Sequence, residues 1–348
     1  MKKTNILQLI TGLGMGGAEK VVLDLAKFTN NQKFNTSVIS MSKRDELLEE
    51  FQSSNIDIEI LRKSNSIKDI FSIIKSINKT IKEKDIEIIH AHMTHSVIVA
   101  SLLKILNPKL KIVYTSHNLN IGSKIRELIV WIIKPLRNID IVFSKDILKY
   151  FYKSNNVLIP NGIQIDKYNL QLDKNKKFTF INIGRLETQK NQVFLIEFAN
   201  KLKEKFDFEI HIVGHGYLEK ELMNLIKQNK LENYIKLLGL RNDIPQLLNQ
   251  SHCLIMPSLW EGLPIVILES GASSLPIIST PVGSIPSLLN SKNSYICELD
   301  KFIKNAERVI NNYDEAKEKG KKLFKDISET YSISEIVKKH EEIYKKLI

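Results

Sequence analysis

The stretch NILQLITGLGMGGAEKVVLDLAKF, residues 5–28, joins an apolar run to a helical pattern through a glycine-rich turn. The run NILQLI is short enough for a buried strand, and EKVVLDLAKF repeats apolar residues at the spacing of an amphipathic helix. Between them, Gly12, Gly14 and Gly17 fit the spacing G-x-G-x-x-G, which lets backbone N–H groups approach a phosphate. The stretch predicts a strand, a tight turn and a helix, the opening of a parallel α/β domain, with or without a phosphate in the turn.

Working outward, the same alternation of strand-like and helix-like segments fills the chain. TSVISM, IEIIHAH and KIVYTS follow in the first half, and FTFINIG, FEIHIVG and CLIMPS restart the series after residue 170. Strands separated by helices form parallel sheets with crossover helices. A length of 348 residues also exceeds the usual size of one hydrophobic core, so we expect two such domains.

The boundary between the two series falls at a turn followed by a polar stretch. Pro160-Asn161-Gly162 forms the turn, and the stretch QLDKNKK after it has no apolar periodicity. We therefore predict two Rossmann-like parallel-sheet domains, over residues 1–165 and 166–330, facing a central cleft. Residues 331–348 are predicted to form a helix that packs back on the N-terminal domain, because their apolar residues fall on one stripe.

The positive charge of the chain is concentrated in its first half. Residues 1–160 hold 24 Lys and Arg against 15 Asp and Glu, which is +9 of the total +12. Within that half, residues 125–137, IRELIVWIIKPLR, place apolar side chains at helical spacing between basic ends. This pattern is typical of a helix that lies on an anionic lipid surface, although a buried helix would have the same pattern. We expect residues 101–160 to bind an anionic membrane surface.

Other features set the expected location and exclude some partners. Cys253 and Cys297 lie far apart in the sequence, each in an apolar run. This is typical of unpaired core cysteines in a protein of a reducing compartment. The N-terminal run lacks a signal-peptide cleavage site, and no run approaches the roughly 20 residues of a spanning helix. The 7% of aromatic residues shows no regular interleaving with the basic residues, so no nucleic-acid partner is expected. We predict a cytoplasmic protein, peripheral on the inner face of the plasma membrane.

Two motifs in the second half carry candidate phosphate-binding groups. Gly184-Arg185 and Lys190 follow the strand FTFINI directly, at the edge where open α/β sheets bind ligands. Arginine can fork onto two phosphate oxygens, and lysine adds a second positive charge. These residue types at a strand end predict a phosphate site.

The second motif, SLWEGLPIVILE over residues 258–269, follows the strand CLIMPS. Pro264 suits the first turn of a helix, so the amides of Gly262 and Leu263 precede a positive dipole end. Glu269 then falls inside an apolar helix, where a buried carboxylate needs a hydroxyl or cation partner. Sugar hydroxyls are such partners, so the motif favours a phosphorylated sugar ligand.

With these motifs in place, the chain resembles the retaining glycosyltransferases of family 4, which have the two-domain GT-B fold and include bacterial surface-polysaccharide enzymes. The resemblance covers essentially the full length. It rests on Gly-Gly-Ala-Glu at 16–19, His90-Ala91-His92, Ser116-His117-Asn118, Pro160-Asn161-Gly162-Ile163, Gly184-Arg185 with Lys190-Asn191, Val213-Gly214-His215-Gly216, Gly239-Leu240-Arg241 with Asp243, and Glu261 paired with Glu269.

The resemblance implies a nucleotide diphosphate-sugar donor. Arg185 and Lys190 would hold its diphosphate. Glu269 would bind the ribose hydroxyls and Glu261 the transferred sugar, while His117 would lie near the sugar and the acceptor. The implied catalytic residues are Glu261, His117, Arg185 and Lys190. The implied donor-binding residues are Gly16, Gly17, Gly184, Arg185, Lys190, Gly214, Arg241, Glu261, Gly262, Leu263, Pro264 and Glu269.

Two positions depart from the family pattern. The glutamate that often follows the strand after the Glu pair is replaced by Ser287, which weakens any role assigned there. The Asn-Gly-Ile turn is usually followed by aspartate, and here Gln164 stands in its place. Neither departure affects the phosphate-binding motifs.

The predicted function is transfer of a hexose or N-acetylhexosamine, with retention, to a glycan linked to a polyprenyl diphosphate, in surface polysaccharide biosynthesis. Arg185 and Lys190 would stabilise the leaving phosphate electrostatically, so we expect no metal and no cofactor. His90, His92 and His95 cluster in the sequence, but no further ligand completes a zinc set, which favours substrate contacts or packing. The alternatives are a nucleotide-sugar epimerase of the same fold and, remotely, a basic nucleic-acid-binding protein.

Overall fold

The structure is a computed structural model that describes residues 2–14, 17–63, 67–117, 121–143, 148–262 and 264–348. The chain divides into two compact units, the first made of Met1–Gly162 with Ile333–Ile348 and the second of Ile163–Ser332. The division falls three residues before the predicted boundary at 165/166. Its reason is local, since Ile163 donates its backbone N–H to the carbonyl of Tyr331 at 2.8 Å.

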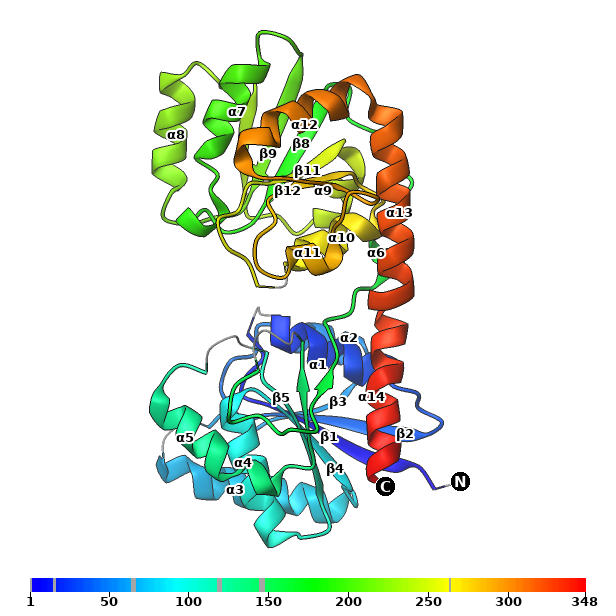
Figure 1. Ribbon diagram of the computed structural model, residues 1–348. Coiled ribbons are helices and arrows are strands. Elements are labelled where there is room, and N and C mark those ends of the chain that lie inside the picture. Colours follow the sequence, from blue (N-terminus) through cyan, green and yellow to red (C-terminus); the bar gives the residue numbers. More distant parts are fainter. Residues whose placement is uncertain (1, 15–16, 64–66, 118–120, 144–147, 263) are drawn as a thin grey trace. The chain divides into compact units, whose positions relative to one another are not determined.

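Unit 1 is built on a seven-stranded parallel sheet in the order β3-β2-β1-β4-β5-β6-β7 (Figure 1). The order reverses between β1 and β4, which makes their carboxyl ends the switch point where doubly wound sheets bind ligands. The strands are β1 (Thr4–Ile10), β2 (Phe34–Ser40), β3 (Asp57–Ile60), β4 (Ile88–His92), β5 (Lys111–Thr115), β6 (Ile139–Val142) and β7 (Val157–Leu158).

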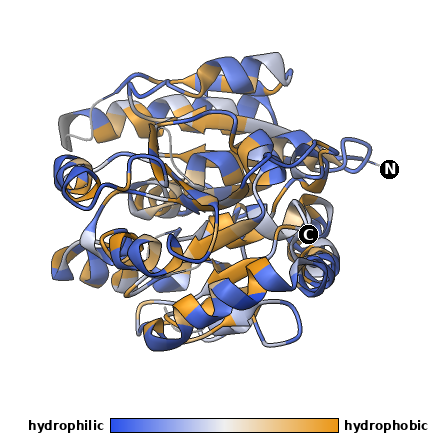
Figure 2. Ribbon diagram, turned by 90° about the horizontal axis from the view of Figure 1, so that it is seen from above, coloured by the Kyte–Doolittle hydropathy of each residue, from blue (hydrophilic) through white to orange (hydrophobic). Residues whose placement is uncertain are grey.

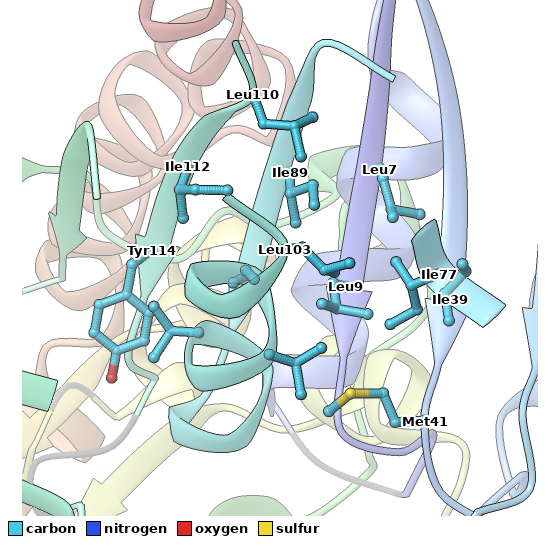
Figure 3. Packing of buried hydrophobic residues seen from close by; sticks show 14 of the residues in the cluster. Leu7, Leu9, Ile39, Met41, Ile77, Ile89, Leu103, Leu110, Ile112 and Tyr114 are labelled. Carbon is cyan, nitrogen blue, oxygen red and sulfur yellow. The ribbon is translucent and has the colours of Figure 1, made fainter. Parts of the chain in front are cut away.

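Helices cover both faces of this sheet because successive strand residues point to opposite sides. Leu7 and Ile89 pack on one face with α3, α4 and α5 (Figure 3), while Ile6 and Ile88 pack on the other with α14. The helices are α1 (Gly17–Phe28), α2 (Leu48–Ser53), α3 (Ile67–Glu83), α4 (Thr94–Leu106), α5 (Lys124–Ile132), the short η1 (Lys134–Leu136) and α14 (Ile333–Leu347).

Unit 2 repeats the topology with six parallel strands in the order β10-β9-β8-β11-β12-β13. Its switch point lies between β8 and β11. The strands are β8 (Phe178–Ile183), β9 (Phe208–Val213), β10 (Ile235–Gly239), β11 (Cys253–Met256), β12 (Ile277–Ser279) and β13 (Tyr295–Ile296).

The helices of unit 2 also form two layers. Phe180 and Ile210 pack with α7, α8 and α12, and Ile181 and Leu254 pack with α9, α10 and α13. Figure 2 shows the corresponding hydropathy, with mostly hydrophobic strands and helices that are hydrophobic on one side. The helices are α6 (Ile165–Tyr168), η3 (Thr188–Lys190), α7 (Phe194–Leu202), α8 (Glu219–Gln228), α9 (Ile244–Gln250), α10 (Ile265–Ala272), α11 (Ile285–Leu288), α12 (Leu299–Asn311) and α13 (Tyr313–Tyr331).

The predicted fold class is confirmed, since each unit is a Rossmann-like parallel sheet between helices. The N-terminal apolar run is strand β1, as its length indicated. Among the described residues, no helix combines the length and the apolar character needed to cross a membrane.

Candidate active site

An ion pair occupies the switch point of unit 2. Lys190, which follows β8, places Nζ 2.6 Å from Oε1 of Glu261, which follows β11. The side chains are only 17% and 4% exposed, so the pair is largely removed from water. Ser258 Oγ donates to the same carboxylate oxygen at 2.8 Å, and Gln189 Nε2 donates to the other at 3.4 Å. The structure therefore joins the two predicted motifs into one site.

Arg185 lies beside this pair with an exposed side chain. Its guanidinium is bound to Oε1 of Glu187 at 2.9 Å, and 70% of the side chain is open to solvent. A surface ion pair of this kind is weak, so Arg185 can turn to an incoming anion at small cost. Gly184 leaves room for the stem of Lys190, since a Cβ there would lie 3.2 Å from Lys190 Cε.

Glycines let the loops around the site contact one another backbone to backbone. A Cβ on Gly214, whose φ is +143°, would lie 1.9 Å from the carbonyl oxygen of Gly184. A Cβ on Gly283, with φ +58°, would lie 1.9 Å from the carbonyl oxygen of Glu261. The loops after β8 and β11 each contact the backbone of a neighbouring loop, and these contacts are close enough that only glycine fits at the neighbouring position. The packing role of Gly283 was missed, although the Pro-Val-Gly turn that contains it is visible in the sequence.

Glu269 lies in α10 with a partner from another helix. The hydroxyl of Tyr168, at the end of α6, donates to Glu269 Oε1 at 2.6 Å. The backbone of Tyr168 is held in turn, because its carbonyl accepts from Asn249 Nδ2 at 2.6 Å. The expected hydroxyl partner of this carboxylate is therefore a protein group, which sequence spacing could not reveal across 101 residues.

The start of α10 differs slightly from the prediction. Pro264 precedes the helix as its N-cap residue instead of occupying its first turn, because its ψ of 112° is extended, and the helix begins at Ile265. Gly262 is half-buried, and its carbonyl accepts from the amide of Ser284 at 3.3 Å. Leu263 lies outside the described residues.

Arg241 lies in the loop after β10, apart from the ion pair in sequence. It forms a bidentate contact with Asp243, with Nε and Nη2 at 2.8 and 2.6 Å from the two carboxylate oxygens. This contact fixes the guanidinium beside its own loop. Arg241 is half-exposed and remains a predicted donor contact.

The glycine-rich turn of unit 1 shows one clear packing role. A Cβ on Gly12 would lie 2.4 Å from Ser42 Oγ in the neighbouring loop, so a larger residue here would require the Ser42 side chain to turn away. Gly14 has no such crowding, with its nearest neighbour 3.5 Å away. Gly17 begins α1 and is exposed. Gly16 lies outside the described residues.

His117 follows β5 with a positive φ of 60°, a conformation that is uncommon for a residue with a side chain. Its Nε2 lies 2.8 Å from Nδ1 of His92, and the two rings stack with centroids 5.1 Å apart. Burial, with a smaller contribution from the nearby His340, lowers the pKa of His117 to about 3. The imidazole is therefore neutral at physiological pH.

The other predicted histidines separate into two environments. His90 and His92 are fully buried on β4, with ring centroids 4.1 Å apart, as strand spacing indicated. His95 is on α4 and half-buried. Across the described part of the chain, no group of three His, Cys, Asp or Glu side chains could hold a metal ion.

The apolar stripe predicted over residues 125–137 forms helix α5 and is split between core and solvent. Val130 is buried and Ile133 packs against the core. The side of α5 that faces solvent carries Ile125, Leu128, Trp131 and Ile132, which are 49–72% exposed. These four residues are called the α5 patch below.

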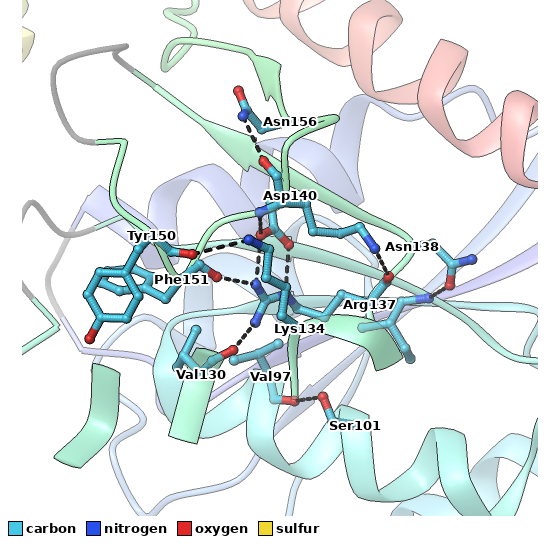
Figure 4. A network of polar contacts seen from close by, with 12 residues as sticks. Val97, Ser101, Val130, Lys134, Arg137, Asn138, Asp140, Tyr150, Phe151 and Asn156 are labelled. Carbon is cyan, nitrogen blue, oxygen red and sulfur yellow. Dashed lines mark hydrogen bonds and ion pairs between the residues drawn. The ribbon is translucent and has the colours of Figure 1, made fainter. Parts of the chain in front are cut away.

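A buried ion pair anchors the helix that carries the α5 patch (Figure 4). Arg137 binds Asp140 with two contacts of 2.8 Å, and both side chains are fully buried. The same guanidinium donates to the carbonyls of Val130, on α5, and Phe151, each at 2.7 Å. Since four of the five guanidinium N–H donors are directed at acceptors, the geometry offsets much of the cost of burying the charge. The patch is thus exposed on a rigidly held helix.

Comparisons with known proteins agree with this arrangement. Residues 15–167 match the family described as Glycosyltransferase Family 4, and residues 164–326 match Glycosyl transferases group 1. The chain is 27% identical over 335 residues to UDP-Gal:alpha-D-GlcNAc-diphosphoundecaprenol alpha-1,3-galactosyltransferase of Escherichia coli, covering 85% of each chain. It is 26% identical over 299 residues to the capsular polysaccharide biosynthesis glycosyltransferase CapH of Staphylococcus aureus, covering 80% of this chain and 81% of that protein.

The fold matches the crystal structure of Anabaena Alr3699/HepE in complex with UDP. The TM-score is 0.84 at 19% identity, covering 99% of this chain and 100% of that one. At this identity the likeness establishes the fold alone, while the two family matches run consecutively through both units. The chain therefore belongs to the family 4 glycosyltransferases and has the GT-B fold.

Proposed function

We propose that this glycosyltransferase moves a hexose or N-acetylhexosamine from a nucleotide diphosphate-sugar to a glycan, with retention of configuration. The observation that carries the proposal is the Lys190–Glu261 pair at the switch point of unit 2, with Arg185 exposed beside it. Lysine and arginine at this edge suit a diphosphate. In this proposal Glu261 binds the hydroxyls of the transferred sugar, and Glu269, which accepts a hydrogen bond from Tyr168, binds those of the ribose.

The reaction breaks the bond between sugar C1 and the diphosphate and forms a bond from C1 to an acceptor hydroxyl. Positive charge develops on the sugar ring and negative charge on the leaving diphosphate. Lys190, Arg185 and the N-terminus of α10 would stabilise that negative charge, and the leaving phosphate would take the proton of the acceptor hydroxyl. Attack from the face of the leaving group gives retention. We infer that these positive charges replace a divalent ion.

For the acceptor, we propose a glycan linked to a polyprenyl diphosphate, in surface polysaccharide biosynthesis. The support is the Escherichia coli relative, whose name gives a diphosphoundecaprenol-linked sugar as its acceptor and which is matched over 85% of both chains. The α5 patch adds support, because Lys124, Arg126 and Lys134 stand among its exposed apolar residues. We propose that the patch docks on the anionic inner face of the plasma membrane.

A screen of nucleotide sugars tests the proposed donor class. Thermal shift and hydrolysis are measured for UDP- and GDP-sugars with the full-length protein, with and without EDTA. We expect one nucleotide class to stabilise the wild type and transfer to proceed in EDTA, with the anomeric configuration of the product retained by NMR. Loss of activity in EDTA, inversion of the anomeric centre, or conversion of the nucleotide sugar to its epimer without transfer would each refute part of the proposal.

Vesicle binding tests the docking surface separately. Flotation with vesicles containing anionic lipid should recover the wild type, and Ile125→Glu should abolish recovery because it places a charge within the α5 patch. Met223→Glu is the matched control, since Met223 is an exposed apolar residue on α8 of unit 2. Equal binding of the wild type and both variants would refute docking through α5.

A further inference from the structure

A row of polar side chains is buried inside unit 1, on the face of the sheet that α14 covers. Gln8 of β1 and both His90 and His92 of β4 have no exposed surface, nor does Tyr344 of α14. They share one face because each strand directs alternate residues toward the helix. Buried polar groups of this kind need partners, and the partners here are one another.

One half of the row runs from β5 to β1 through α14. His90 Nε2 lies 2.8 Å from Thr115 Oγ1, and His90 Nδ1 lies 2.8 Å from the hydroxyl of Tyr344. Gln8 Nε2 donates to that same hydroxyl at 3.2 Å. Tyr344 therefore connects a histidine of β4 to the amide of Gln8.

The other half of the row runs from Gln8 to the candidate active-site histidine. Gln8 Oε1 lies 2.8 Å from His92 Nε2, and His92 Nδ1 lies 2.8 Å from His117 Nε2. Five hydrogen bonds in series thus connect Thr115 to His117, and the second and third of them meet at the hydroxyl of Tyr344.

The orientation of the Gln8 amide decides which atom donates in each hydrogen bond of the row. With the Gln8 amide oriented as in the structure, its oxygen accepts from His92 Nε2, which then carries the proton of that contact. His92 is neutral, because burial lowers its pKa well below the usual value, so its Nδ1 is unprotonated and accepts from His117 Nε2–H. His117 is neutral as well. With its single proton on Nε2, its Nδ1 keeps a free lone pair.

The contacts on the far side of Gln8 agree with the same direction. The Nε2 group of Gln8 donates to Tyr344, whose own proton is then directed at His90 Nδ1. His90 is neutral through burial and carries its proton on Nε2, facing Thr115. Each of the five hydrogen bonds has one donor and one acceptor. Rotation of the Gln8 amide by half a turn would therefore reverse the donor and the acceptor in every one of them.

We propose that Tyr344 and Gln8 are positioning residues that hold His117 as the tautomer protonated on Nε2, leaving Nδ1 to accept a hydrogen bond from a hydroxyl of the sugar or the acceptor. This inference rests on the proposed function, together with the family resemblance that implies a position for His117 near the sugar and the acceptor. It assigns a role to α14, the last helix of the chain, which returns to unit 1 and supplies Tyr344.

The tautomer can be measured directly in the unmodified protein. Nitrogen NMR of the full-length chain labelled with 15N-histidine distinguishes protonated from unprotonated ring nitrogens, and His117→Asn identifies the His117 signals. At pH 7 we expect Nε2 of His117 to be protonated and Nδ1 to be unprotonated. The reverse assignment, or an even mixture of the two tautomers, would overturn the proposal, and the only variant this measurement needs is His117→Asn, which serves for signal assignment.

Tyr344→Phe tests the positioning role because it keeps the ring and removes the hydroxyl that orients Gln8. We expect a mixture of His117 tautomers and a kcat about tenfold lower, the scale of one lost hydrogen bond, with donor affinity unchanged. Gln8→Met should act in the same way from the other side of the contact. Tyr313→Phe, which removes a buried hydroxyl from unit 2, is the control and should change neither quantity.

The outcomes separate this inference from the proposed function. An unchanged His117 tautomer in both Tyr344→Phe and Gln8→Met would refute the positioning role while leaving the phosphate site untouched. A mixed tautomer with unchanged kcat would refute the contribution of the His117 tautomer to transfer. The proposed function itself is tested independently by the donor screen, in which failure of every nucleotide sugar to bind, or conversion without transfer, would refute it.

Discussion

The two units share one topology but place opposite chemistry at their switch points. Between β8 and β11, unit 2 presents the charged pair Lys190 and Glu261, with the cationic Arg185 exposed nearby. Between β1 and β4, unit 1 presents neutral groups, with His92 bonded to His117 and to Gln8. Fixed positive charge suits a phosphate, and neutral acceptors suit hydroxyls.

The comparison teaches that strand order selects the edge of the sheet and that side chains select the ligand. In unit 2 the charged groups come from the loops that follow the strands, where Arg185 is exposed and the Lys190–Glu261 pair is largely covered. In unit 1 the polar groups His90 and His92 belong to the strand itself and are buried against α14. Burial keeps those histidines neutral, because removing them from water penalises the charged form.

The largest expected effect concerns the acid stability of the two units. Burial lowers the pKa of His117 to about 3 and that of His340 to about 4, from 6.5, and lowers those of His90 and His92 as well. The unfolded chain therefore binds protons below pH 6.5 that the folded chain does not, so stability falls as the pH falls. We expect a loss of about 1–2 kcal/mol per histidine at pH 5.

Hydrogen exchange of the full-length chain at pH 7 and pH 5 measures this difference. In unit 2 the pKa of the half-buried His252 is lowered to about 4. Amides of β4 should therefore lose several kcal/mol of opening free energy, while those of β8 lose less, because solvent screens the charge of a half-buried histidine. Equal losses in the two sheets would contradict the neutral, buried state of the unit 1 histidines.

The next effect concerns the charged switch point. Lys190→Ala removes the cation nearest the proposed leaving phosphate, and we expect a decrease of about 10²–10³-fold in kcat for transfer. The control is Lys201→Ala on α7, whose lysine is exposed and pairs only with Glu197. Circular dichroism and melting temperature show whether each variant folds. Full activity of folded Lys190→Ala would remove Lys190 from the mechanism.

Local periodicity predicted the sheets well because burial repeats at short range. Leu7 and Ile6 point to opposite faces and meet different helices, as two-residue alternation requires. The position of Lys190 and Glu261 at strand ends followed from the same pattern together with the family resemblance. Their direct contact could not be predicted, since 71 residues separate them and only the β8–β11 pairing brings them together.

The hydrogen-bond partners of the site residues could not be predicted from the sequence. Tyr168 reaches Glu269 from 101 residues away, and Tyr344 reaches His90 from 254 residues away. Nothing in the local pattern distinguishes Tyr344 from any other apolar-face residue of its helix. Such pairs depend on how a helix packs against the sheet, which is a property of the whole core and not of a motif.

A smaller effect tests the glycine contacts that hold the loops of unit 2. Gly214→Ala places a methyl group 1.9 Å from the carbonyl oxygen of Gly184, so the loop after β8 must move. We expect a loss of roughly 2–3 kcal/mol in unfolding free energy, together with weaker donor binding. Gly239→Ala is the matched control, because its φ is +66° but no atom lies within 4 Å of the added Cβ. It should cost about 1 kcal/mol, and similar losses for both variants would refute the steric argument.

The smallest expected effect concerns the hydroxyl of Tyr168, a neutral group of unit 2 that contacts Glu269. Tyr168→Phe removes the hydroxyl that donates to Glu269 at 2.6 Å and leaves the carboxylate free to rotate. If Glu269 binds the ribose, donor affinity should fall about threefold to tenfold, the range of one hydrogen bond, while kcat at saturating donor stays unchanged. Calorimetric titration with the nucleotide alone measures the affinity, and Tyr313→Phe controls for loss of a buried hydroxyl. A lower kcat with unchanged affinity would contradict ribose binding by Glu269. It would mean that Tyr168 and Glu269 act on the transferred sugar during the reaction.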